Sequence, residues 1–145
     1  MQSSVRLIVP GVPDGDLRDH GGLLTKLRLE CSDSLSAIHQ QMDDLAARTR
    51  ELPGGYPTLV LQRRSDRQSC SLRWLSGEGR MLSDARFQAT VFGLPQVVRA
   101  WLLRSQFQAC WLNSQERVCR ILADEYAALS GVLVQSSSPA VSSEA

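Results

Sequence analysis

The sequence has few residues of the kinds that bind metals. Of its 145 residues, only two are histidines, and none of its four cysteines belongs to a C-x-x-C pair. Zinc sites need closely spaced thiolate or imidazole ligands, so we predict no metal site and no cofactor. We expect the cysteines to be reduced and to act as small core residues. They are Cys31, Cys70, Cys110 and Cys119.

The common nucleotide-binding and catalytic motifs are also missing. The chain has no G-x-G-x-x-G, P-loop, G-x-S-x-G or H-E-x-x-H motif. Gly54-Gly55 follows a helical pattern and precedes a strand pattern, the reverse of the order in a phosphate-binding loop. His20 and His39 are far in sequence from any nucleophile, although one could meet them in space. Asp43, Asp44 and Glu116 are expected to be solvated acids. We predict no enzyme and assign no catalytic residue.

No apolar run reaches the roughly 18–20 residues of a membrane helix, and the N-terminus lacks the pattern of a signal peptide. A cytoplasmic location without a membrane partner is the resulting expectation. The chain is 43% hydrophobic and 21% charged. These values, at this length, predict one globular domain.

Lysine is nearly absent, because fifteen of the sixteen basic residues are arginine. The formal net charge is only +1, but residues 57–120 hold ten basic and four acidic groups. Arginine suits bidentate contacts with phosphates and bases. A GC-rich genome would also replace lysine by arginine everywhere, so only the clustering of arginines is informative.

An apolar stripe predicts helix from Asp16 to Leu52. Leu24, Cys31, Ile38 and Leu45 recur every seven residues. Gly21-Gly22 and the serines near position 33 leave open whether this is one helix or two. Self-pairing in a coiled coil is a further alternative. Pro53 and the two glycines after it end the segment.

Residues 57–82 predict an antiparallel β-hairpin or a three-stranded meander. Apolar residues alternate over Thr58–Gln62 and Ser69–Leu75, with turn-forming residues between them. Arg80-Met81-Leu82 would supply the third strand. Trp74 either anchors the ribbon to the core or stacks on a nucleic-acid base. We assign nucleic-acid binding to the arginines of the ribbon: Arg63, Arg64, Arg67, Arg73 and Arg80.

Two further helices are predicted in the remainder. Ser83-Asp84 caps a short helix over Ala85–Phe92, which ends at Gly93. Leu94-Pro95 then opens a long helix to about residue 130, with Gly131 as its stop and a break near Asn113-Ser114 as the alternative. Trp101 and Trp111 point to different faces of that helix, so one could be an exposed anchor.

The predicted fold class is α+β: a helical N-terminal half, a central hairpin or meander, and a long C-terminal helix. Residues 1–13 are expected to form a short arm or edge strand, and 14–134 a single domain. The Ser-rich residues 135–145 are expected to be disordered.

Three stretches resemble a known family. They are LVLQRRSDRQSCSLRW at Leu59–Trp74 with Gly79-Arg80 after it, L-P-x-x-V-R-x-W at Leu94–Trp101, and LNSQERVCR at Leu112–Arg120. These are similar to small proteins of unknown function encoded on bacterial integrating conjugative elements, some described as integrase regulator R. The resemblance spans about residues 15–130. It implies a mobile-element protein associated with control of integrase expression, and supplies no catalytic residue.

Two functions compete at this stage. The first is an accessory regulator that contacts single- or double-stranded DNA through the arginine-rich ribbon. The second is a protein–protein adaptor, or a module that pairs with itself through its helices, without direct contact to DNA.

Overall fold

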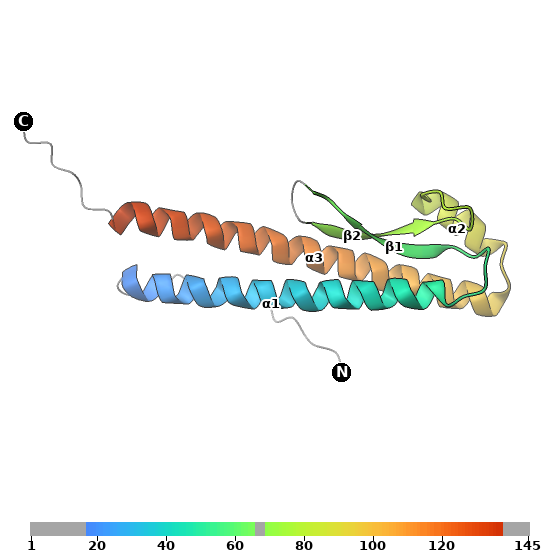
Figure 1. Ribbon diagram of the computed structural model, residues 1–145, viewed down its shortest axis with the longest axis horizontal. Coiled ribbons are helices and arrows are strands. Elements are labelled where there is room, and N and C mark those ends of the chain that lie inside the picture. Colours follow the sequence, from blue (N-terminus) through green and yellow to red (C-terminus); the bar gives the residue numbers. More distant parts are fainter. Residues whose placement is uncertain (1–16, 66–68, 138–145) are drawn as a thin grey trace, which may run out of the picture. The chain divides into compact units, whose positions relative to one another are not determined.

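The computed structural model describes residues 17–65 and 69–137 and confirms the α+β fold class. Its elements in chain order are α1 (Leu17–Arg50), β1 (Thr58–Arg63), β2 (Cys70–Leu75), α2 (Asp84–Phe92) and α3 (Gln96–Ser137) (Figure 1). The predicted N-terminal arm over 1–13, Arg67 and the last eight residues lie outside the described residues.

The chain divides into two compact units. One is the continuous stretch Leu35–Val118, which contains the hairpin and α2. The other joins the described parts of Met1–Ser34 and Cys119–Ala145. Since α1 and α3 each contribute to both units, the units are described separately below.

α1 is one continuous helix, which answers the question that the sequence left open. Neither Gly21 nor the serines near position 33 interrupt it. Cys31, Ile38 and Leu45 of the predicted stripe are buried. The helix ends before two glycines, of which Gly55 has a φ of 98°. This left-handed backbone is readily adopted only by glycine.

β1 and β2 form a two-stranded antiparallel sheet in which Leu61 pairs with Leu72. The predicted third strand is not formed, because within the described residues Met81 makes only an isolated bridge to Leu75. The sheet is therefore the hairpin, and the meander is wrong. β2 shows the expected alternation, with Leu72 and Trp74 buried. In β1 Leu59 is buried, but Leu61 is only half-buried, like its neighbour Val60.

α2 begins as predicted, because the Ser83 hydroxyl accepts a hydrogen bond from the Arg86 N–H, and it ends at Gly93. α3 differs from its prediction at the C-terminal end. It continues through Gly131 as far as Ser137, without a break at Asn113-Ser114. A glycine costs helix stability without ending a helix by itself. The predicted stop is therefore wrong, and the first three residues of the expected disordered tail are helical.

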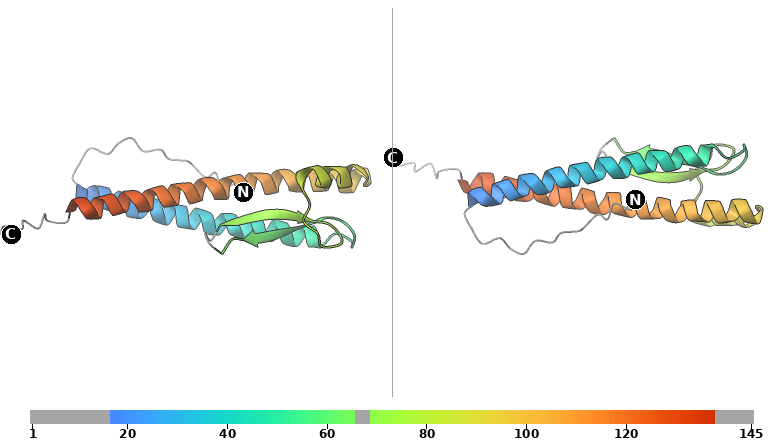
Figure 2. Two further views of the ribbon diagram at one scale, coloured as in Figure 1. Left: turned by 90° about the horizontal axis from the view of Figure 1, so that it is seen from above. Right: turned by 90° about the horizontal axis from the view of Figure 1, so that it is seen from below.

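Within Leu35–Val118, the hairpin lies along the C-terminal half of α1 and the N-terminal half of α3 (Figures 1 and 2). The Trp74 ring stacks on Phe87 of α2, with ring centroids 4.4 Å apart. The inner face of the sheet, α2 and the two helices thus share one core. Its buried apolar residues include Ile38, Met42, Leu45, Leu59, Leu72, Trp74, Phe87, Val91, Leu102 and Leu112.

The other unit has little core of its own. Among its described residues only Cys31 and Cys119 are buried hydrophobic side chains. Leu29, Leu129 and Val132 are at least half exposed. This unit consists of the described helical residues 17–34 and 119–137, and burial there is shallow throughout.

Candidate functional site

The outer edge of β2 is paired with side chains of α3. In an antiparallel pair, alternate residues direct their N–H and C=O groups away from the partner strand. Asn113 behaves like a peptide group of a third strand: its Oδ1 accepts from the Leu72 N–H at 2.7 Å, and its Nδ2 donates to the Leu72 C=O at 3.1 Å. Glu116 Oε1 accepts from the Cys70 N–H at 3.3 Å. Helix side chains therefore replace the missing strand.

One backbone group on the edge of β1 is bonded in the same way by α1. The Thr49 hydroxyl is fully buried, accepts from the Leu59 N–H at 2.8 Å and donates to the Ala46 carbonyl at 2.8 Å. We call Thr49, Asn113 and Glu116 the edge-binding residues. Exposed strand edges promote association with other strands, and these residues occupy backbone groups that would otherwise do so.

Two more polar contacts connect the elements beneath the hairpin. His39 Nε2 of α1 lies 3.4 Å from Glu116 Oε1 of α3. The Trp74 indole N–H donates to Gln106 Oε1. The buried carboxylate of Glu116 is thus shared between the β2 backbone and a histidine. Through these contacts Glu116 connects α3 to both β2 and α1.

The edge-binding residues were missed by sequence reasoning. Glu116 was expected to be solvated, yet it is only 4% exposed. The detectable signal was their position, because Asn113 and Glu116 lie beside Leu112 and Cys119 on the buried side of an amphipathic helix. Polar residues placed there need partners, and a nearby strand edge can supply them. The same signal was present for Thr49, which follows the apolar residues Met42 and Leu45 at helical spacing.

The predicted nucleic-acid-binding arginines do not form one cluster. Arg63 and Arg64 are exposed at the C-terminal end of β1. Arg73 pairs with Val60, and is exposed on the opposite face of the sheet from Arg63, which pairs with Cys70. Arg80 lies in the turn at the other end of the hairpin. Five residue steps along the strands, or roughly 17 Å, separate that end from Arg63. Trp74 is buried in the core, so it is not available to a base.

A different surface stands out on α3. Leu103, Phe107, Trp111 and Val118 are exposed by 39, 70, 58 and 44%. At about 100° per residue they lie within about 80° of one another, opposite the buried side of the helix. We call these four residues the outer stripe. Trp101 is half-buried, in agreement with the expectation that the two tryptophans point differently.

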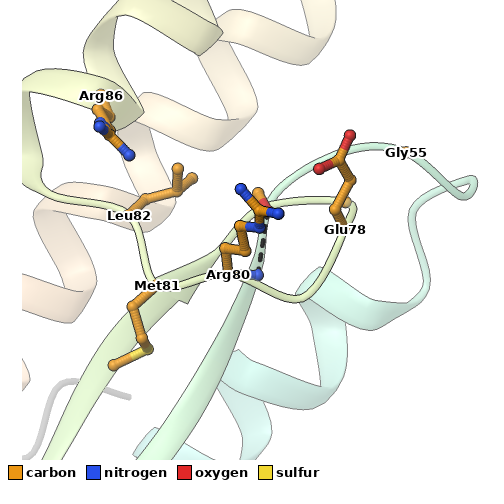
Figure 3. Close-up of a pocket in the computed structure, with 8 residues that line it drawn as sticks. Gly55, Glu78, Arg80, Met81, Leu82 and Arg86 are labelled. Atoms are coloured by element: carbon orange, nitrogen blue, oxygen red, sulfur yellow. Dashed lines mark hydrogen bonds between the residues drawn. The ribbon is translucent and has the colours of Figure 1, made fainter.

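An open pocket of about 520 Å³ lies beside the turn that follows β2. The turn is closed by the Ser76 N–H donating to the Arg80 carbonyl, and Gly79 there has a φ of 81°. Figure 3 shows the Glu78 and Arg86 side chains on opposite sides of Arg80. The lining therefore combines charges of both signs with apolar groups. It consists of Gly55, Ser76, Gly77, Glu78, Arg80, Met81, Leu82 and Arg86.

The cysteines differ in exposure. Cys31, Cys70 and Cys119 are buried as expected, whereas Cys110 is exposed. Burial, together with the nearby Glu30 carboxylate, raises the pKa of the Cys31 thiol. Within residues 17–65 and 69–137, no three His, Cys, Asp or Glu side chains gather in a way that could hold a metal ion. Over the same residues, no helix combines the length and apolarity that crossing a membrane requires.

Comparison with known proteins gives no family assignment. No family model, curated protein or solved structure matches the chain. The resemblance to integrase regulator R-like proteins therefore stays a prediction, and the interpretation of function depends on the geometry of the chain itself.

Proposed function

We propose that this protein is a non-enzymatic interaction module that binds another protein through the outer stripe of α3. The observation that carries the proposal is the exposure of Phe107 and Trp111, two large aromatic side chains one helical turn apart. Aromatic side chains are enriched at the energetic centres of protein interfaces. Contiguous exposed apolar surface commonly marks an interaction site.

The two sides of α3 support this interpretation. The inner side has its own packing partners, because Leu102, Ala109 and Leu112 are buried. The outer stripe contributes nothing to that core, so its apolar residues have no evident role in folding this unit. In the setting that the family resemblance implies, the partner would be a protein that takes part in the control of integrase expression.

The proposal is tested by capture of binding proteins from cells of the source organism with two variants of the tagged chain. Phe107→Ser/Trp111→Ser removes the aromatic part of the stripe. Gln88→Ser/Gln108→Ser changes two exposed polar residues as the matched control. A protein retained by the wild type and the control, and lost with the stripe variant at unchanged helicity, supports the proposal. Equal capture by all three proteins contradicts it.

Direct contact with nucleic acid is the second candidate. It is favoured by the exposure of Arg63, Arg64 and Arg73, for which the described residues supply no ion-pair partner. Such arginines can contact phosphates, and β-ribbons do enter DNA grooves. The placement of these arginines on two faces of the sheet makes this candidate weaker than the first.

Fluorescence anisotropy with labelled single- and double-stranded DNA at about 50 and 200 mM salt tests the second candidate, since binding through phosphates weakens steeply with salt. Arg63→Ala/Arg64→Ala/Arg73→Ala should then reduce affinity and the salt dependence. Arg48→Ala/Arg50→Ala, at exposed positions of α1, is the control. No binding of either DNA at the lower salt rejects this candidate.

A further inference from the structure

The outer stripe is bordered by positive charge on both sides. Taking Leu103 as the origin, the positions of Arg99 and Arg117 fall about 40° to one side, and that of Arg104 about 100° to the other. Arg104 and Arg117 are exposed, and Arg99 is half-buried. The apolar stripe therefore runs between two arginine flanks.

α3 itself adds no negative charge to this surface. Residues 96–115 of α3 contain no aspartate or glutamate. The next residue, Glu116, is buried and accepts from the Cys70 N–H, so it does not reach the stripe. No acid within 96–118 therefore offsets the arginine flanks.

We propose that the occupant of the outer stripe is an acidic amphipathic helix of another protein. The inference depends on the interaction function proposed above and adds the chemistry of the partner. Apolar residues of the partner helix pack on the stripe, and Glu or Asp residues at its flanks meet the arginines. Complementary charge across an interface gives specificity, whereas like charges oppose association.

A second copy of this chain fits the surface less well. Pairing two outer stripes would bring the arginine flanks of both copies together without acids between them. The exposed face of α1 from Leu35 to Arg50 has no large apolar side chain that could receive the stripe instead. Self-association through this surface is therefore disfavoured by the repulsion between arginines and by the lack of a matching apolar face on α1.

A lipid surface fits less well for a geometric reason. Interfacial helices have a broad apolar face, whereas this stripe covers only about 80°. Such a narrow stripe is the width of a helix–helix seam, in which the flanking arginines lie beside the partner helix.

The test uses fluorescent synthetic helices of about 21 residues, or three heptads, with leucine at the seam positions. One peptide has Glu at both flanks, a second has Lys there, and a third keeps Glu but has Ser in place of the seam leucines. Anisotropy is measured with the full chain at about 50 mM salt. We expect the Glu peptide to bind at least about tenfold more tightly than either of the others.

Two variants separate charge from apolar contact. Arg99→Glu/Arg104→Glu/Arg117→Glu should reverse the preference, so that the Lys peptide binds more tightly. Phe107→Ser/Trp111→Ser should bind neither peptide. Cys110, the exposed cysteine on this side of α3, reports the location of binding, because the Glu peptide should slow its reaction with a thiol reagent.

The outcomes distinguish this inference from the function on which it depends. Equal affinity for the Glu and Lys peptides, both lost with Phe107→Ser/Trp111→Ser, would overturn the acidic partner and leave the interaction surface in place. If no peptide binds, and the wild type and Phe107→Ser/Trp111→Ser capture the same proteins from cells, both the acidic partner and the interaction surface would be overturned. Binding of anionic vesicles without peptide binding, or dimerisation that the stripe variant abolishes, would assign the stripe to lipid or to a second copy.

Discussion

The polar residues on the inner side of α3 and the apolar residues on its outer side differ in what they contact. The inner side places Gln106, Asn113 and Glu116 against the hairpin, where their polar atoms meet backbone and indole groups. The outer side presents Phe107 and Trp111 to solvent. The difference teaches that the side chains on each side of a helix match what that side contacts. A strand edge requires hydrogen-bonding side chains, and an exposed apolar stripe indicates a surface that is covered on binding.

The largest expected effect compares the tryptophans of the two surfaces. Trp74 is 5% exposed and stacks on Phe87, so Trp74→Ala should lower the free energy of unfolding by about 3–5 kcal/mol. Trp111→Ala removes the same atoms from the outer stripe and should change it by about 0.5 kcal/mol or less. Urea unfolding followed by circular dichroism measures both. A large loss with Trp111→Ala would place that side chain in the core and end the comparison.

The inner polar residues are tested by Asn113→Leu. The Leu72 N–H and C=O lose both partners, which should cost about 2–3 kcal/mol of unfolding free energy even though leucine favours helix. The control is Ser114→Leu, the next residue along α3, which is exposed and should be nearly neutral. Equal stability of the two variants would show that the amide does not stabilise the strand edge.

Thr49 sharpens the same point at the edge of β1. Thr49→Val keeps the shape but removes the oxygen that accepts from the Leu59 N–H, so we expect a loss of about 1–2 kcal/mol. Thr25→Val, in the same helix, removes an exposed hydroxyl that bonds only to the Gly21 carbonyl. If both variants lose the same free energy of unfolding in urea, the hydrogen bond from Leu59 of β1 to Thr49 does not stabilise the protein more than an exposed one.

The smallest effect concerns a glycine whose role was predicted wrongly. Gly131 lies inside α3, and apart from its neighbours and the nearby helix backbone no atom lies within 4 Å of where a Cβ would be. Gly131→Ala should therefore raise the unfolding free energy by about 0.5–1 kcal/mol. Gly55→Ala should lower it instead, because alanine disfavours the φ of 98° there. Loss of helicity in Gly131→Ala would contradict the placement of Gly131 inside α3 and support its predicted role at the end of the helix.

Much of the fold was predictable from local patterns. The seven-residue repeat through Cys31, Ile38 and Leu45 predicted α1, and Ser83 with Gly93 bounded α2 because caps act within one turn. The third strand and the stop at Gly131 were wrong for a common reason. A short apolar run or a single glycine has only a weak preference, and tertiary contacts decide its outcome.

The candidate site was predicted less well than the fold. The sequence pointed to the arginines of the hairpin, yet the alternation of side chains along the strands places Arg63 and Arg73 on opposite faces. The length of the strands also separates Arg63 from Arg80. The possibility that Trp111 is an exposed anchor was stated, and its 58% exposure agrees with it. The function itself, including any contact with DNA, stays a prediction.

The sequence by itself determined where the helices and the hairpin lie, but not the end of α3 or the number of strands, because apolar periodicity and capping are properties of neighbouring residues. It also determined that α3 has arginines and no acids over 96–115. Only the tertiary structure decided which side of α3 is covered. The side that is covered bears Asn113 and Glu116, which bond to the edge of β2, together with buried apolar residues such as Leu112, and Phe107 and Trp111 lie on the other side.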